Sequence, residues 1–299
     1  DNEFTHIASF CAETAEKLFI KAYDEESARG VLRHIVMRKN RKGEFSVCLV
    51  VAERHKKLDI LAEKLQAGFP QIIGIHINVN KRRDNVIFGN ETYCVLGEDT
   101  LRDELCGKIF EISPRAFYQV NAEMAEKLYN HAKALAHNEK ENNIILDLYC
   151  GAGTIGLCLA DEKDRLCGVE IIADAVENAK KNAILNGRAE ENTLFVCGDA
   201  SLGVAECKKA FGTPDVIILD PVYKLFAGDE NSAEEVSEFM LSMDELAMRM
   251  HASIIYCHHH SKGSQGGKRS MDRASGSGVF ARDPDALLDL TQLEVTDAL

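Results

Sequence analysis

The sequence lacks the features that direct a protein into or across a membrane. No apolar run approaches the roughly 20 residues that a helix needs to span a bilayer. Residues 1–13 (DNEFTHIASFCAE) have neither the basic start nor the apolar centre of a secretory signal. We therefore expect a cytoplasmic protein with no membrane partner. Its 299 residues, 45% hydrophobic and 28% charged, are enough to bury one or two cores, so soluble α/β domains are expected.

The sequence also lacks paired cysteines, although it contains ten of them without a single CxxC. Zinc and iron–sulfur sites commonly take their ligands from such pairs, so we predict no metal site. Three consecutive histidines, His258 to His260, do not change this, because neighbours on a strand point to opposite faces. Reduced, buried thiols are the expected state. The cysteines lie at positions 11, 48, 94, 106, 150, 158, 167, 197, 207 and 257.

Charge is distributed unevenly along a chain whose net charge is −13. Residues 214–299 hold 7 Lys and Arg against 15 Asp and Glu, a net of −8, whereas residues 1–90 hold 15 basic against 12 acidic residues, a net of +3. Basic clusters of this kind can follow a phosphate backbone, and solvated loop tips are the alternative. The clusters are Arg38, Lys39, Arg41 and Lys42, then Arg54, Lys56 and Lys57, then Lys81, Arg82 and Arg83.

Apolar periodicity predicts helices and strands in alternating order. A helix at 12–21 precedes a hairpin within 31–51, whose strands flank the polar turn RKNRKGE. An amphipathic helix at 58–69 and a strand at 72–80 follow. Beyond residue 120 the alternation specifies a parallel sheet with helices on its faces. The expected strands there are 145–150, 166–170, 193–199 and 215–220, and the expected helices are 121–136, 154–160, 173–186 and 202–210.

The segment ILDLYCGAGTIG (145–156) is the most informative part of the sequence about the ligand that the protein binds. An apolar run reaches Asp147 and a glycine-rich turn follows, as where a buried parallel strand delivers backbone N–H groups to a nucleotide-like ligand. Gly151 and Gly153 allow a sharp turn and a close approach to a group that a side chain would block. The strand and spacing differ from those of the GxGxxG nicotinamide site.

Acidic residues end the next two strands. Glu170 follows the glycines by about 20 residues, where a carboxylate can accept hydrogen bonds from both hydroxyls of a ribose. Asp199 ends the third strand, in position to meet a base. Asp147, Glu170 and Asp199 in this order predict a ligand that contains a ribose. The alternative is an α/β domain that binds some other nucleotide.

Five segments follow one another in a characteristic order: YDEESARGVLRHIVMRKNRKGEF, INVNKRRDNVIFGNETYCVLGEDTL, FEISPRAFYQVNAEMAEKLY, ILDLYCGAGTIGLCLA and GVEIIADAVENAKKNAILNG. Through them, residues 1 to about 213 resemble the class I RNA uracil-5-methyltransferases, which methylate carbon 5 of uridine in ribosomal or transfer RNA. The resemblance implies S-adenosyl-L-methionine as cofactor and RNA as partner, with 23S ribosomal RNA the expected type. By the resemblance, Gln119, Tyr149, Glu170 and a later strand-end aspartate would contact the cofactor. Together with the glycine turn and the acidic strand ends, the expected cofactor-binding residues are Gln119, Tyr149, Gly151, Gly153, Glu170, Asp199 and Asp220.

The chemistry of that family requires a cysteine nucleophile. A thiolate adds to carbon 6 of uracil, the resulting enolate attacks the methyl group, and a base removes the proton on carbon 5. In the family the nucleophile lies in a segment like YVSCNP. Here Cys257 in IIYCHHHSKG is the candidate, and an ordinary strand-end cysteine is the alternative. Glu294 is the available glutamate, outside any recognisable base motif.

Residues 214–299 resemble instead the C-terminal half of RecA-fold ATPases of the replicative helicase type. By that resemblance Asp220, at the end of DVIILD, is the Walker B aspartate, and the segment after the next strand senses phosphate. The sensing residues would be His258, His259, His260 and Lys262. ATP is thus a second possible ligand, but the phosphate-binding string GxxxxGK[ST] is absent; GSQGGKRS (263–270) has the wrong glycine spacing.

These observations predict an α/β chimera with a junction near 212–221. We expect a class I methyltransferase Rossmann-like parallel sheet preceded by a smaller α+β domain, with a RecA-like α/β C-terminal segment that adds strands to the sheet. The expected domains are 1–112, 113–213 and 214–299. The predicted function is an S-adenosylmethionine-dependent RNA uracil-5-methyltransferase with an incomplete active site. The alternatives are a fragment of a replication ATPase and a non-catalytic protein that binds cofactor or RNA.

Overall fold

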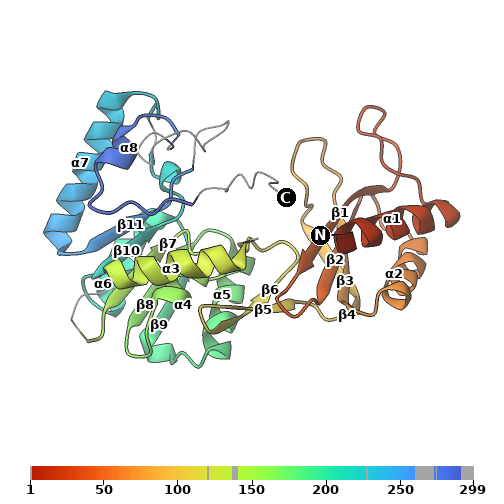
Figure 1. Cartoon of the computed structure of the whole chain (residues 1–299), viewed down its shortest axis with the longest axis horizontal. Helices are drawn as coiled ribbons and strands as arrows, with labels where there is room; N and C mark the ends of the chain where they lie inside the picture. The colour runs from red at the N-terminus through yellow and green to blue at the C-terminus, as the bar shows by residue number, and fades with distance from the viewer. Residues whose placement is uncertain are drawn as a thin grey trace, which may run out of the picture. The chain divides into compact units, whose positions relative to one another are not determined.

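The structure, a computed structural model, describes residues 2–119, 121–136, 141–226, 228–259, 273 and 275–290 (Figure 1). The chain divides into two compact units. The first comprises residues 1–104 and 109–118, and the second comprises residues 105–108 and 119–299. Within the part of the chain that is described, no helix is long and apolar enough to cross a membrane.

The first unit is built on a four-stranded sheet with the strand order β1-β2-β3-β4. β2 pairs antiparallel with β1 and parallel with β3, and β3 pairs antiparallel with β4. A separate hairpin, β5–β6, leads out of this unit. The elements are α1 (Asn2–Lys17), β1 (Leu32–Lys39), β2 (Phe45–Val51), α2 (Lys57–Gly68), β3 (Ile72–Val79), β4 (Glu91–Gly97), β5 (Leu101–Leu105) and β6 (Lys108–Ile112).

The core of the first unit lies between this sheet and the two helices that cover one of its faces (Figure 1). Ile7, Cys11 and Ala15 repeat every fourth residue, so they share one face of α1 and are buried. The predicted hairpin, the helix at 58–69 and the strand at 72–80 are confirmed. The first helix begins and ends earlier than the predicted 12–21, because the backbone of Phe19 turns to φ +56° and its ring is exposed.

The second unit is built on a five-stranded parallel sheet with the strand order β11-β10-β7-β8-β9. The predicted parallel sheet with alternating helices is confirmed. Its elements are α3 (Ala122–Ala136), β7 (Ile144–Leu148), α4 (Thr154–Leu159), β8 (Arg165–Glu170), α5 (Ala173–Leu185), η1 (Glu190–Asn192), β9 (Thr193–Cys197), η2 (Ala200–Leu202), α6 (Gly203–Ala210), β10 (Val216–Leu219), η3 (Val222–Lys224), α7 (Ala233–Met250), β11 (Ser253–Tyr256) and α8 (Val279–Arg282).

Both strands that follow residue 213 belong to this sheet. β10 pairs with β7, and β11 pairs with β10, so the α7 helix is the crossover between them. Four successive residues of β10, Val216–Leu219, are buried, as expected for a strand covered on both faces. Residues 214–299 thus add two strands to the sheet, as expected, and the second of them is Ser253–Tyr256.

Helices cover both faces of the sheet. α6 and α7 pack on one face, where Cys207 and Met243 join a core formed with β7, β8 and β10. α4 contacts β7 and β8, and α5 contacts β8 and β9. Because the sheet starts with β7 and then grows in both directions, the chain reverses its strand order between β7 and β10. The carboxyl ends of these strands form the usual ligand position of an open α/β sheet.

Candidate functional site

The loop after β7 has the backbone geometry that its glycines predict. Tyr149, Gly151 and Gly153 have φ of +65°, +54° and +77°, so the chain turns through the left-handed region three times in five residues. A Cβ added to Gly153 would lie 3.1 Å from the Phe195 ring, whereas one added to Gly151 would meet no atom within 4 Å. Gly151 thus presents its backbone to open space, where a ligand can approach it.

Two carboxylates hold this loop in place. The N–H of Gly156 donates to Asp147 Oδ2 at 2.9 Å. The N–H of Gly151 donates to Glu170 Oε2 at 3.1 Å, and the N–H of Ile172 donates to Glu170 Oε1 at 3.0 Å. Both acids are buried, and each oxygen that accepts one backbone hydrogen bond retains a second lone pair. The predicted ribose acceptor Glu170 therefore also fixes the glycine loop beside it.

The carboxylates at this edge repel one another. Burial raises the pKa of Asp147 to about 7, and the charges of Asp220 and Glu170 push it in the same direction. Burial also raises the pKa of Asp220, against the opposing effects of Cys257, His259 and Lys224. Acidic groups whose charged forms are disfavoured gain stability when a cation lies among them. The electrostatics of the edge therefore favour a ligand with a positive charge.

Cys257, the candidate nucleophile, lies beside Asp220. The two side chains are hydrogen-bonded, with the thiol as donor to the carboxylate. Backbone hydrogen bonds fix the pair, because the N–H of Cys257 donates to Leu219 O at 2.9 Å and the N–H of Val222 donates to Cys257 O at 3.0 Å. Burial and the charges of Asp220 and Asp147 raise the pKa of the Cys257 thiol well above its usual range. The sulfur is therefore held as a protonated thiol.

Tyr129 is a member of this group that the sequence analysis missed. It lies on α3, is buried, and shares a side-chain hydrogen bond with Gln119. Burial and the nearby charge of Asp220 raise the pKa of its phenol, so the hydroxyl stays neutral. Tyr129 thus connects Gln119 with the Asp220 and Cys257 pair. No local motif marks it, because a tyrosine at helical spacing is typical of an ordinary core position.

Tyr149 and Asp199 occupy the more open part of the edge. Lys224 Nζ lies 4.9 Å from the centroid of the Tyr149 ring, which links the loop after β7 with the loop after β10. Asp199 is exposed and accepts a hydrogen bond from the N–H of Ser201 at 2.9 Å, and its charge raises the pKa of Tyr149. All seven predicted cofactor residues and Cys257 therefore lie at or beside the carboxyl ends of the five strands.

Only part of the predicted phosphate-sensing segment is described. His258 is hydrogen-bonded through Nε2 to the carbonyl of Ser275 at 2.8 Å, and its ring lies 4.4 Å from that of Phe280. His259 is exposed near Asp220, whose pKa it lowers, and lies against the Tyr223 ring. The remaining predicted positions lie outside the described residues; they are His260, Lys262, the segment 263–270 and Glu294.

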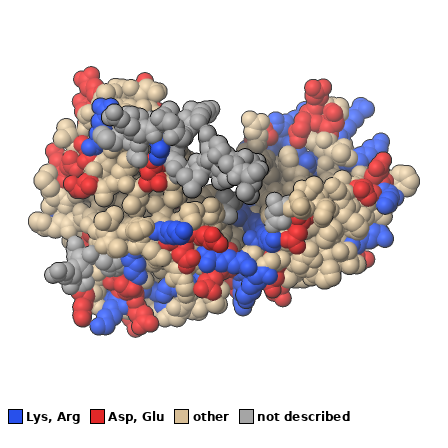
Figure 2. All heavy atoms as spheres, viewed as in Figure 1, with Lys and Arg blue, Asp and Glu red and all other residues tan. Residues whose placement is uncertain are grey.

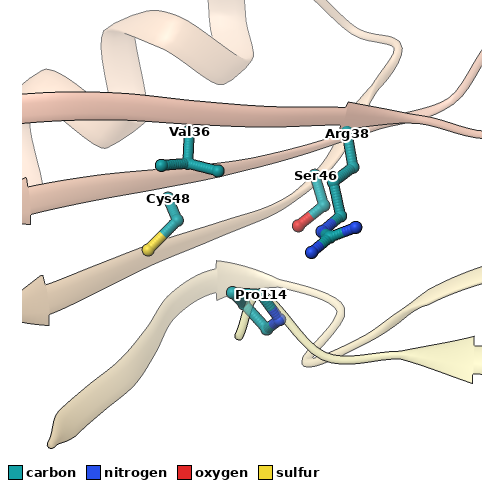
Figure 3. A pocket seen from close by; sticks show the side chains of 5 residues that line it. All are labelled: Val36, Arg38, Ser46, Cys48 and Pro114. Carbon is teal, nitrogen blue, oxygen red and sulfur yellow. The ribbon is translucent and has the colours of Figure 1, made fainter. Parts of the chain in front are cut away.

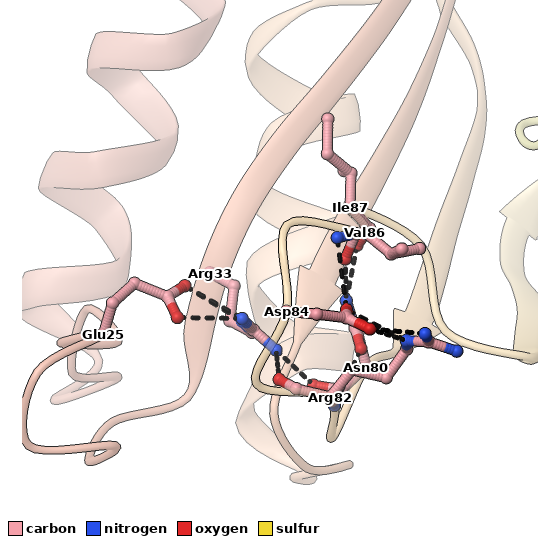
Figure 4. Close-up of polar contacts among 7 residues, drawn as sticks. All are labelled: Glu25, Arg33, Asn80, Arg82, Asp84, Val86 and Ile87. Carbon is pink, nitrogen blue, oxygen red and sulfur yellow. Dashed lines mark hydrogen bonds and ion pairs between the residues drawn. The ribbon is translucent and has the colours of Figure 1, made fainter.

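Lys and Arg side chains are spread over the first unit among Asp and Glu (Figure 2). Arg33 holds the loop that carries the third basic cluster (Figure 4). It donates to the carbonyls of Asn80 and Arg82 at 3.0 and 2.6 Å and to both oxygens of Glu25 at 2.9 Å. Asn80 Nδ2 donates to the carbonyls of Val86 and Ile87, which closes the loop. This loop presents Lys81 and Arg83 to solvent.

A small hollow on the first unit receives one residue of the first basic cluster (Figure 3). Arg38 points from β1 toward Pro114 and donates to the carbonyl of Ala116. Its Nε is buried without a hydrogen-bond partner, and burial lowers the pKa of the guanidinium. Arg38 is therefore partly withdrawn from solvent, unlike the exposed Lys42. The hollow is lined by Val36, Arg38, Ser46, Cys48 and Pro114.

A parallel sheet with a glycine loop and acidic strand ends at its point of reversed strand order defines an α/β domain of the class that binds nucleotide-like cofactors. The chain belongs to the tRNA (uracil-5-)-methyltransferase family, whose profile matches residues 4–196. A second profile, described as an AAA domain, matches residues 176–265. The family assignment agrees with the resemblance predicted for residues 1 to about 213.

Relatives of known sequence support this assignment, and a solved structure supports the fold. An uncharacterized RNA methyltransferase of Streptococcus agalactiae is 37% identical over 226 residues, 75% of this chain and 49% of the relative. One from Staphylococcus aureus is 34% identical over 227 residues, with the same two coverages. The chain thus spans about half the length of these relatives. The crystal structure of Pyrococcus abyssi tRNA (uracil-54, C5)-methyltransferase with S-adenosyl-L-homocysteine covers 72% of this chain and 50% of its own, with 23% identity and a TM-score of 0.57, and so shares its fold.

Proposed function

We propose that this chain binds S-adenosyl-L-methionine at the carboxyl edge of β7 to β11 and acts on RNA as a uracil-5-methyltransferase, with 23S ribosomal RNA the expected type. One observation carries the proposal. Asp147, Glu170 and Asp220 crowd their negative charges around a glycine loop whose Gly151 faces open space. A ligand with a ribose and a positive charge fits that arrangement better than a triphosphate does.

Several of the proposed cofactor residues have a definable chemical role. Glu170 would accept from the ribose hydroxyls, and Gly151 would bring its backbone close to the ligand. Asp220 and Asp147 would offset the positive charge, while Gln119 would be oriented by Tyr129. The proposed cofactor-binding set is Gln119, Tyr149, Gly151, Gly153, Glu170, Asp199 and Asp220.

Bound S-adenosylmethionine would supply an electrophilic methyl group on a sulfonium cation. Cys257 is the proposed nucleophile toward carbon 6 of uracil, and it must first lose its proton. Asp220 accepts the hydrogen bond of the thiol and is therefore the group positioned to take that proton. A neighbouring positive charge would lower the pKa of Cys257, whereas Asp220 and Asp147 raise it. We therefore expect the thiol to become reactive only when the edge is occupied.

The basic groups of the first unit are the proposed RNA contacts. Lys81 and Arg83 stand exposed on the loop that Arg33 holds, and Lys42 is exposed in the β1–β2 turn. Contacts of this kind bind phosphates without reading sequence. An RNA substrate and a ligand made in the cytoplasm agree with the expected cytoplasmic location.

The AAA-domain match over residues 176–265 supports the ATPase relationship as a second candidate. Under it Asp220 would orient magnesium or water, and His259, which lies near Asp220, would sense phosphate. The absence of a GxxxxGK[ST] string from the sequence weighs against hydrolysis by this chain alone. A protein that holds cofactor or RNA without catalysis is the third candidate, and the protonated Cys257 thiol favours it.

Calorimetric titrations with S-adenosylhomocysteine and with ATP and magnesium, run in parallel on the whole chain, separate these candidates. We expect saturable binding of S-adenosylhomocysteine, weakened on Glu170→Gln, and no affinity for ATP. Binding of ATP that is lost on Asp220→Ala would instead favour the ATPase relationship. Failure of both ligands to bind would refute the cofactor site.

Methyl transfer tests the catalytic part separately. With labelled S-adenosylmethionine and a uridine-containing RNA, we expect transfer that disappears on Cys257→Ala. The variant should still bind S-adenosylhomocysteine, which shows that its fold and cofactor site are intact. Transfer that survives in Cys257→Ala would exclude Cys257 as the nucleophile. Cofactor binding without any transfer by the unaltered chain would leave the non-catalytic candidate.

A further inference from the structure

Three metal-ligating side chains meet in the first unit, whereas the residues of the cofactor edge belong to the second. His76 on β3, Cys94 on β4 and Asp99 just beyond β4 place one nitrogen, one sulfur and one carboxylate oxygen within 4.8 Å of one another. It is the one such group of three found among the described residues. His76 is buried, whereas Cys94 and Asp99 are exposed. The cluster is therefore buried on the side of His76 and open to solvent on the side of Cys94 and Asp99.

Strand pairing brings together His76 and two residues that lie far from it in the sequence. His76 and Cys94 are direct partners in the antiparallel β3–β4 pair, so their side chains lie on the same face. The register shifts between Ile75 and His76, and such a bulge redirects the side chains beside it. The sequence has no CxxC or similar spacing at these positions, so it gave no sign of the site.

Two glycines let the third ligand reach the first two. Gly97 ends β4 with φ +74°, and a Cβ there would lie 2.0 Å from Ile73 O. A Cβ on Gly74 would lie 2.2 Å from Glu98 O. The chain after β4 therefore lies directly against β3, and the N–H of Glu98 donates to Ile73 O at 2.8 Å. This close approach places Asp99 beside Nε2 of His76.

The distances between the ligand atoms of the cluster are close to those found around a tetrahedral zinc ion. His76 Nε2 lies 2.9 Å from the Asp99 carbonyl oxygen and 3.9 Å from its Oδ1. At usual bond lengths, the ligand atoms of tetrahedral zinc are separated by about 3.3–3.8 Å. The cluster therefore has to contract by less than about 1.5 Å to reach that geometry. Since the Asp99 side chain is 86% exposed, it is free to make the adjustment.

The charges and proton positions also suit a cation. A histidine ring nitrogen is among the commonest ligands of such ions. Without an ion, the ring donates from Nε2 to the Asp99 carbonyl and leaves the buried Nδ1 without a hydrogen-bond partner. An ion on Nε2 would move the ring proton to Nδ1. Asp99 and Glu98 place negative charge near the Cys94 thiol, and a bound cation would counter that charge.

We propose that His76 Nε2, Cys94 Sγ and the Asp99 carboxylate form a binding site for zinc or a similar soft divalent ion. Nitrogen and sulfur ligands select such ions over magnesium and calcium, which prefer oxygen. The fourth ligand is water or the Asp99 carbonyl. Binding would release the proton of the Cys94 thiol and fasten the chain after β4 to β3. The site shares no residue with the cofactor edge, and the proposal does not depend on the proposed methyl transfer.

Cobalt(II) is the probe for this site, because cobalt bound to a thiolate absorbs through a charge-transfer band that hexaaqua cobalt lacks. The whole chain, reduced and stripped with a chelator, is titrated with cobalt(II), and zinc(II) is then added. We expect a saturable band that zinc abolishes. We also expect Cys94→Ser to remove it and Asp99→Asn to weaken binding at least about tenfold. Both replaced side chains are exposed, so these variants should fold.

Cys197→Ser provides the matched control, since Cys197 is an exposed cysteine of the second unit. It should leave the cobalt band and its affinity unchanged. The absence of a band in the unaltered chain would overturn the proposal. A band that persists in Cys94→Ser would overturn it as well, because another cysteine would then be the ligand. Unchanged affinity in Asp99→Asn would remove Asp99 from the site and with it the proposed three-ligand set.

Discussion

The Cys257 thiol donates its hydrogen bond to the Asp220 carboxylate, which joins the ends of β10 and β11 at the edge of the sheet. Each group alters the pKa of the other. Asp220 disfavours the thiolate, and the thiol partly offsets the effect of burial on the carboxylate. The residue that is proposed as nucleophile and the residue that is proposed to contact the cofactor therefore share one proton-dependent contact.

Asp220→Asn should make Cys257 easier to alkylate. Removing the carboxylate charge lowers the pKa of the thiol, because Asp220 raises it in the unaltered chain. We expect the iodoacetamide reaction of Cys257 at pH 8, followed by mass spectrometry, to accelerate on the order of tenfold. Alkylation of the exposed Cys197 in the same digest is the internal control and should not change. An equal rate for Cys257 in both proteins would contradict the proposed contact.

Asp147→Asn should change stability in a pH-dependent manner. Burial raises the pKa of Asp147 from 3.8 to about 7, so the folded state binds this proton more tightly than the unfolded state. That stabilisation is complete below about pH 4 and is lost as the pH rises through about 7. The asparagine variant should therefore gain ~1–3 kcal/mol relative to the unaltered chain between pH 5 and pH 8.

Denaturant unfolding at both pH values measures this effect. The exposed Asp199 offers a control, since hydrogen bonds from Ser201 lower its pKa and place its titration below the tested range. Asp199→Asn should show no comparable trend between pH 5 and pH 8. A constant difference between Asp147→Asn and the unaltered chain at the two pH values would show that the pKa of Asp147 in the folded state does not lie near 7.

Gly151→Ala should weaken S-adenosylhomocysteine binding. The added methyl group meets no protein atom within 4 Å, so it projects into the space where the ligand is proposed to lie. We expect calorimetry to give an affinity at least about tenfold lower, since a lost close approach costs more than ~1.4 kcal/mol. Gly187→Ala is matched, because Gly187 also has a positive φ, +69°, and open space around it. Gly187→Ala should lower the free energy of unfolding by a similar amount and leave the affinity for S-adenosylhomocysteine unchanged.

Arg33→Met should destabilise the first unit. The Arg33 side chain is 2% exposed, and the change leaves the carbonyls of Asn80 and Arg82 without their charged donor. We expect a loss of ~1–3 kcal/mol in the free energy of unfolding, measured by thermal denaturation. Arg54→Met removes the exposed Arg54–Asp59 pair of the same unit and should cost less than ~0.5 kcal/mol. Similar losses in both variants would mean that Arg33 does not anchor the loop.

The sequence predicted the second unit well, because its pattern is local. Each strand from 145 to 220 is a short, mostly apolar run and each helix has its own periodicity, so the observed order of elements from β7 to β10 along the chain follows from the alternation. The glycine loop was equally visible, since only glycine readily takes the φ values of Gly151 and Gly153. Fold and loop could therefore be predicted from residues close together in the chain.

Contacts between distant segments could not be predicted in the same way. The hydrogen bond between Tyr129 and Gln119 depends on how α3 settles against the sheet, which no pattern in α3 records. The cluster of His76, Cys94 and Asp99 depends on a register shift and on two close backbone approaches. The end of the first helix at Lys17 was misplaced because the turn at Phe19 has no glycine or proline to mark it.

The strand order also indicates a structural role for the acidic C-terminal segment, residues 214–299. β7 has β8 on one side and β10 on the other, and β11 lies outside β10. A protein truncated at residue 213 would leave bare the backbone amides and carbonyls of β7 that now face β10, along an apolar rim. Such a rim invites strand addition between molecules. Whatever its ancestry, the segment 214–299 therefore covers the edge of β7 and prevents aggregation through that edge.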